Sequence, residues 1–156
     1  MMIRLALLSL VAAQPALALS CLAPSVARST VEAVSAEETF RIAVGSFFYD
    51  EVELPADGTS IEPTETSIPA VFDGHALTRE GFTTEVSSEV VLQVECIGPS
   101  CGSVPADTEA LAFFREVGGE LVLDVNACPG WVFPEPTEAQ LETVRNCVVD
   151  QDCPEG

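Results

Sequence analysis

The sequence contains no lysine, and its six arginines stand against 25 aspartate and glutamate residues, for a net charge of −19. This lack of cations excludes nucleic-acid binding, because affinity for a phosphate backbone depends on cationic side chains that release counterions. The same repulsion excludes binding to anionic membrane surfaces. Two interpretations of the acidity stay open: binding of a basic or cationic partner, or a surface that only keeps the chain soluble.

Side chains suited to acid–base or nucleophilic catalysis are also scarce, since His75 is the single histidine. A lone histidine without a positioned partner supports neither a catalytic triad nor a zinc site. Residues 98–102 match G-x-S-x-G, but a nucleophile elbow needs a helix directly after the serine and a histidine later in the chain. Val104 and Pro105 follow instead, and His75 precedes. We therefore predict no enzyme, no metal site and no cofactor.

One long apolar run is present, and it lies at the N-terminus. Residues 5–13 are too few to span a bilayer, and residues 16–18 (Ala-Leu-Ala) supply the small-x-small pattern of a signal peptidase site. We expect a signal peptide over residues 1–18, with cleavage as late as Ser20 left open, and a secreted or periplasmic chain without an integral membrane segment. The residue three before Cys21 is alanine where a lipoprotein signal needs a branched one, so we expect no lipid anchor.

The remaining residues, 19–156, are one domain by length and hold all six cysteines. An exported chain with an even number of cysteines favours three disulfides, although the residues alone leave their pairing open. Zinc binding would need paired C-x-x-C or Cys/His spacings, which are absent.

Apolar periodicity predicts a β-rich domain. Strand patterns occupy residues 40–48, 86–96, 110–117 and 120–126. Gly118-Gly119 predicts a hairpin between the last two, and Asp73-Gly74 predicts another. Gly45 inside the first strand indicates a bulge or a close approach of two backbones.

Helices are predicted near both ends of the domain. Residues 25–38 carry apolar side chains at helical spacing, and a capping box over residues 137–140 opens a helix through about Val148. Residues 50–68 are rich in acids, contain two prolines and no base, and therefore predict a long acidic loop. These elements describe a compact barrel or sandwich with peripheral helices.

Several short motifs follow one another in a recognisable order. An N-terminal Cys21 and a short helix precede a strand, a Cys-Gly pair and two further strands, carried by Leu22-Ala23-Pro24, Ile42-Ala43-Val44-Gly45, Cys101-Gly102, Leu111, Phe113 and Cys128. This order resembles the netrin-module family, which includes the tissue inhibitors of metalloproteinases and secreted bacterial relatives. The resemblance covers most of the mature chain through motifs that are each short.

The resemblance implies a mainly β fold, namely a small disulfide-stabilised barrel like that of oligonucleotide/oligosaccharide-binding (OB) domains, with a short N-terminal and a C-terminal helix. The family begins with C-x-C, but position 19 is leucine here. The disulfides that the resemblance then implies are Cys21–Cys128, Cys96–Cys101 and Cys147–Cys153.

The family's inhibitors chelate a protease zinc through the α-amine and carbonyl of their first cysteine. Cleavage after Ala18 would start this chain two residues before Cys21, and the Cys21 amine would then not be free. Metalloproteinase inhibition is therefore an alternative and not the leading hypothesis. The leading hypothesis is a binding domain whose partner is a protein, and an envelope-associated structural protein is a further alternative. Trp131 and Phe133 are candidates for an exposed aromatic contact with that partner, although covering the open end of the barrel is their other possible role.

Overall fold

A single sheet of seven strands forms the framework of the computed structural model, which describes residues 20–55 and 62–153. The predicted signal peptide over residues 1–18 lies outside the described residues. The strands are β1 (Phe40–Phe48), β2 (Thr64–Thr78), β3 (Gly81–Ile97), β4 (Ser100–Cys101), β5 (Ala110–Val117), β6 (Glu120–Val125) and β7 (Val132–Pro134). The helices are α1 (Val26–Ser35), η1 (Glu51–Glu53), α2 (Glu138–Arg145) and the π-helical turn η2 (Asn146–Asp150).

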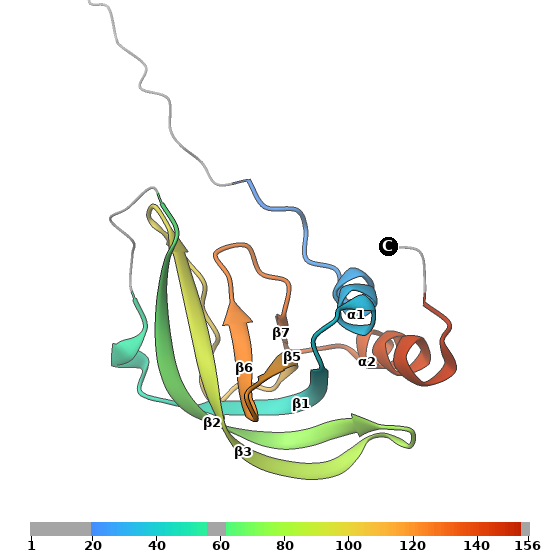
Figure 1. The fold of residues 1–156 in the computed structure, drawn as a ribbon. Coiled ribbons are helices and arrows are strands. Elements are labelled where there is room, and N and C mark those ends of the chain that lie inside the picture. The colour runs from blue at the N-terminus through green and yellow to red at the C-terminus, as the bar shows by residue number, and fades with distance from the viewer. Residues whose placement is uncertain (1–19, 56–61, 154–156) are drawn as a thin grey trace, which may run out of the picture.

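Five of the strands pair in a ring (Figure 1). β1 pairs with β2 along one edge and with β5 along the other, and β2 pairs with β3. β6 completes the ring by pairing in parallel with β3 and antiparallel with β5. The mainly β fold class with a helix near each end is thereby confirmed.

The ring encloses the larger of two hydrophobic cores. Phe47, Phe72 and Phe114 meet at its centre, with ring centroids 5.0 to 6.0 Å apart and almost no exposed area. Their tilted and edge-on contacts are favourable for aromatic pairs and add to the area each ring buries. Every strand of the ring thus buries one of its faces in this core.

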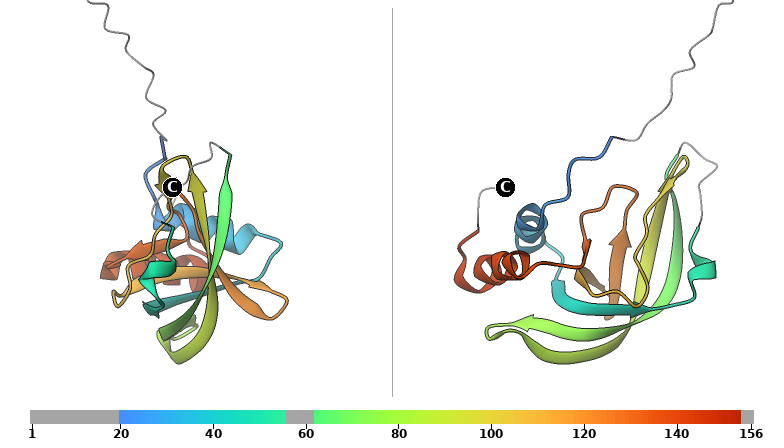
Figure 2. Two further views of the ribbon diagram at one scale, coloured as in Figure 1. Left: turned by 90° about the vertical axis from the view of Figure 1, so that its left-hand side faces the viewer. Right: turned by 180° about the vertical axis from the view of Figure 1, so that it is seen from behind.

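A second core lies between the outer face of β5 and the two helices, which sit on the same side of the sheet (Figure 2). Leu111 and Phe113 of β5 pack there against Val26 of α1 and Val144 of α2. This explains why β5 is apolar on both faces rather than alternating. The predicted capping box opens α2, because Thr137 and Gln140 each bond the other's backbone. None of the described helices has the length and apolarity to cross a membrane.

The predicted hairpin at Asp73-Gly74 is wrong, because β2 runs straight through these residues and turns only after Thr78. Gly74 lies opposite Gly45 of β1. A Cβ atom added at Gly45 would lie 2.6 Å from the Gly74 Cα and closer still to the Asp73 carbonyl oxygen. The two glycines therefore allow a close approach of two backbones, one of the two readings proposed for Gly45, instead of a turn.

The predicted acidic loop over residues 50–68 is too long. β2 begins at Thr64, and Ile68 is buried in the larger core. Pairing with β3 overrides the local charge, since residues 64–67 extend the strand with their acidic and hydroxyl side chains in solvent and burial begins at Ile68. Residues 56–61 of the predicted loop lie outside the described residues.

The structure contains three disulfides, and they are the three pairs that the resemblance implied. Cys21–Cys128 ties the segment before α1 to the loop after β6, across a separation of 107 residues. Cys96–Cys101 joins β3 to β4, and Cys147–Cys153 closes the segment after α2. All six cysteines are therefore bonded.

Candidate binding groove

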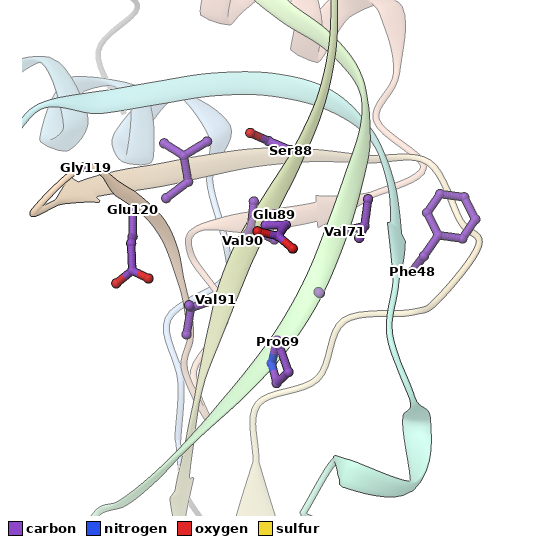
Figure 3. Close-up of a pocket in the computed structure, with 11 residues that line it drawn as sticks. Phe48, Pro69, Val71, Ser88, Glu89, Val90, Val91, Gly119 and Glu120 are labelled. Atoms are coloured by element: carbon purple, nitrogen blue, oxygen red, sulfur yellow. The ribbon is translucent and has the colours of Figure 1, made fainter.

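A hollow in the described part of the surface lies on the outer face of β2 and β3, between the end of β1 and the β5–β6 turn (Figure 3). Its volume is about 590 Å³. β1, β2, β3, the β5–β6 turn and the start of β6 supply its lining, namely Phe48, Pro69, Ala70, Val71, Ser88, Glu89, Val90, Val91, Gly119, Glu120 and Leu121. We call this hollow the binding groove.

Strand alternation places apolar side chains at the groove. Phe47 points into the larger core and is fully buried, so its neighbour Phe48 must point outward, where 45% of its surface is exposed. Val71 lies directly opposite Phe48 on β2 and is 39% exposed. The side chains of this cross-strand pair give the wall of the groove an apolar contact surface.

The charged residues in the lining are both acidic. Glu89 lies opposite Val71 on the next strand, and Glu120 opens β6; both are exposed. Figure 3 shows that they come from different elements, one on β3 and the other beside the β5–β6 turn. An apolar wall with acidic groups at its rim favours a partner that carries both apolar and cationic side chains.

One arginine of the neighbouring strand β5 is already engaged in an ion pair. Arg115 of β5 donates two hydrogen bonds to the Asp124 carboxylate, at 2.6 and 2.8 Å. These bonds are the main reason that the pKa of the guanidinium is raised above its ordinary value. Arg115 therefore pairs with Asp124 and not with Glu89 or Glu120.

A ladder of polar side chains continues the outer face beyond the groove. Ser67 on β2 donates to the Gln93 Oε1 at 2.7 Å, and the Gln93 Nε2 donates to the Glu65 carboxylate at 3.2 Å. These groups satisfy one another and mark where the apolar part of the face ends.

The predicted exposed contact at Trp131 and Phe133 is wrong for Phe133, which is only 7% exposed. Phe133 packs edge-on against Phe113 in the second core. Trp131 is half-buried, packs against both cores and stacks on Phe40 with ring centroids 5.0 Å apart. The pair thus fills the junction between ring and helices, since β7 begins directly after Trp131, pairs with β5 and buries Val132 and Phe133.

The other candidates from the sequence lie apart from the groove. His75 is exposed on β2, opposite Glu85, and does not line the groove. Ser100 of the G-x-S-x-G match sits in the two-residue strand β4, and the adjacent Cys101 is bonded to Cys96. Over the described ranges, no group of three or more histidine, cysteine or acidic residues is placed to hold a metal ion.

Phe48 and Val71 were not among the residues predicted to contact a partner. The signal for Phe48 was present, because two consecutive phenylalanines in one strand cannot both face the same core. Which of the two faces outward depends on the pairing of β1 with β2 and β5, and the sequence does not show that register.

The single tyrosine fixes the end of β1 beside the groove. Tyr49 donates its hydroxyl to the Val104 carbonyl, and its burial, with a smaller effect of Glu51, raises its pKa above the ordinary 10.0. The unfolded chain therefore loses this proton first. We expect the stabilisation by Tyr49, relative to Tyr49→Phe, to be constant below about pH 10 and to decline above it.

Urea unfolding of both proteins from about pH 8 to about pH 11 measures this difference. The phenolate absorbance of the wild type reports Tyr49 alone, because the chain has no other tyrosine. A difference in unfolding free energy that stays constant through this range would contradict the raised pKa.

Comparison of the chain with family models, curated proteins and solved structures finds no match in any of the three.

Proposed function

We propose that this chain is an exported, disulfide-held domain that acts by binding another protein. The observation that carries the proposal is the binding groove, where Phe48 and Val71 present an apolar pair to solvent beside Glu89 and Glu120. Apolar side chains gathered at a hollow and rimmed by polar groups are typical of protein-interaction sites.

The order of the strands supports an OB-type barrel as the scaffold. Five strands pair in a ring, and helices flank it at both ends of the chain. OB folds bind ligands on the face of their second and third strands and at the adjoining loops. The binding groove occupies β2, β3 and the β5–β6 turn. Its acidic rim disfavours an oligonucleotide and favours a protein with cationic groups.

Export is supported by the sulfur chemistry of the chain. Its three disulfides persist in oxidising compartments outside the cytosol. The N-terminal pattern that ends at residues 16–18 supplies the matching targeting signal. The two together support a secreted or periplasmic location.

A binding role fits the groove better than hydrolysis by its two carboxylates. Glu89 and Glu120 are both exposed to solvent. In glycoside hydrolysis, by contrast, the general acid is a carboxyl group enclosed by apolar side chains. The groove lining also contains no histidine, so Ser88 has no Ser–His pair there.

Metalloproteinase inhibition is the second candidate. Its support is that the segment from Ser20 to Ala23 is exposed while Cys21 is held against Cys128. The chemistry requires that Cys21 be the first residue, so that its amine is free to bind zinc. Intact-mass analysis of the exported chain identifies the first residue and so decides this alternative.

Substitution of the groove's apolar pair tests the proposed function. We expect Phe48→Ser combined with Val71→Ser to weaken capture of a partner from the exported proteins of the source cells by about tenfold or more. An aromatic anchor that becomes buried in a complex contributes about 1.4 kcal/mol or more to a typical interface. Immobilised wild type and variant, probed with the same fraction and quantified by mass spectrometry, give the comparison.

Val34→Ser is the matched control, since Val34 is 50% exposed on α1 and lies outside the groove lining. Its capture should equal that of the wild type. A protein recovered equally by all three forms would not be bound at the groove, and such a result would leave the envelope-associated structural role as the better account.

A further inference from the structure

One edge of β3 is open along half of the strand. β2 pairs with β3 from Gly81 to Cys96, whereas β6 covers its other edge only from Val90 to Val94. No described strand pairs with the second edge of residues 82–89. The backbone N–H and C=O groups along such an edge can pair with another strand.

Residues 84–89 of this edge lack a proline and a bulge, two features that usually block strand addition, but they include two charged residues, Glu85 and Glu89. An extra residue, Thr83, makes a bulge near the hairpin tip, because Leu77 pairs with Phe82 and Ala76 with Thr84. Residues 84–89 then continue without a proline or a further bulge. The open edge of β2, by contrast, contains Pro69, which cannot donate a backbone hydrogen bond.

A hollow lies on each side of this edge. The binding groove reaches it through Ser88 and Glu89. A second cavity of about 310 Å³ reaches it from the other side through Val86. Gly119 and Leu121 line both, so the two hollows meet at the β5–β6 turn. A strand added beside residues 84–89 would lie end to end with β6.

The two hollows suit the two faces of an added strand. Successive side chains of a strand point to opposite faces, so alternate side chains would enter each hollow. The second cavity is mainly apolar, since Phe72, Val86 and Phe114 contribute to it. Its Arg41 is paired with Glu116 at 3.1 Å. It therefore fits apolar side chains, and the groove with Glu89 and Glu120 fits cationic ones.

Charge also decides between a partner protein and a second copy of this chain. Glu85 and Glu89 lie on the same face of β3, and Asp73 lies opposite Ser87 between them. Pairing of two β3 edges would bring these carboxylates near their own copies, and like charges across strands are destabilising. A segment with arginine or lysine at alternate positions would neutralise them instead.

We propose that the open edge of β3 at residues 84–89 receives an extended segment of a partner protein as an added β-strand, with cationic side chains toward the binding groove and apolar side chains toward the second cavity. This inference rests on the proposed function, because it names the chemistry of the partner that the groove binds. Main-chain hydrogen bonds supply the affinity and the alternating side chains supply the selectivity.

The probe is a fluorescent synthetic peptide of about eight residues in which arginine alternates with valine. We expect it to bind the oxidised protein and to slow amide hydrogen exchange within residues 84–89. Two further peptides carry N-methyl groups at alternate residues, one at the odd and one at the even positions, so that each blocks the N–H groups along one edge of the extended peptide. One of the two should bind at least about tenfold more weakly than the unmethylated peptide. This comparison leaves the protein unchanged, so folding defects cannot explain a loss.

Reversal of charge on β3 tests the electrostatic part of the proposal. Glu85→Arg with Glu89→Arg should weaken binding of the arginine–valine peptide about tenfold and strengthen binding of a matching glutamate–valine peptide.

Equal binding of methylated and unmethylated peptides, without slowed exchange at residues 84–89, would overturn the proposal. Dimerisation of the free protein with the same amides protected would also overturn it, by assigning the edge to a second copy. If the peptide fails to bind while Phe48→Ser with Val71→Ser still weakens partner capture, the proposed function stands and the added strand does not.

Discussion

Phe47→Ala is expected to lower the free energy of unfolding by about 3–5 kcal/mol, whereas Phe48→Ala should change it by less than about 1 kcal/mol. The two phenylalanines are adjacent in β1, but Phe47 is fully buried and Phe48 is 45% exposed. Removing the Phe47 ring leaves a cavity against Phe72 and Phe114 that the closed ring of strands cannot fill by collapse.

Urea unfolding monitored by the single tryptophan, Trp131, measures both variants. Each serves as the control for the other, since the substitution and the strand are the same. The pair also separates stability from binding, because Phe48→Ala should weaken partner capture while leaving the fold intact. Similar losses of stability in the two variants would contradict the register of β1 in the sheet.

Removal of the long-range disulfide is expected to have the second large effect. Cys21→Ala with Cys128→Ala should lower the free energy of unfolding by about 3–5 kcal/mol, because the bridge closes a loop of 107 residues in the unfolded chain. Cys147→Ala with Cys153→Ala opens a loop of only 6 residues and should cost about 2 kcal/mol.

Both double variants leave no odd thiol, so disulfide exchange does not complicate the comparison. Urea unfolding under oxidising conditions gives the two free energies, and reduction of the wild type gives the effect of losing all three bridges together. An equal cost for the two double variants would show that loop length does not govern the stabilisation in this protein.

The elements that local sequence determines were predicted well. β5 begins and ends at the predicted residues, and the Gly118-Gly119 hairpin lies where the glycines indicated. Both glycines adopt positive φ angles, which a turn of this kind requires and which other residues rarely adopt. The Thr137–Gln140 capping box likewise depends on neighbours in sequence alone.

The errors share one cause, which is that partners distant in sequence decided the outcome. Gly74 looked like a turn residue, but the backbone of Gly45 in another strand gives it its role. Residues 64–68 looked like an acidic loop, but β3 pairs with them. Phe133 has the local pattern of an exposed contact, but β5 and the helices that pack on it bury its side chain.

The amino-acid sequence by itself determined the acidity of the surface, the three-disulfide chemistry of the chain and the strand periodicity, because each depends on composition or on neighbouring residues. Only the tertiary structure decided that Phe48, and not Phe47, faces solvent, and that β6 leaves half of the β3 edge open. The physical reason is register: a shift of one residue in the pairing of a strand exchanges its buried and exposed faces, and the pairing is set by strands far apart in the chain.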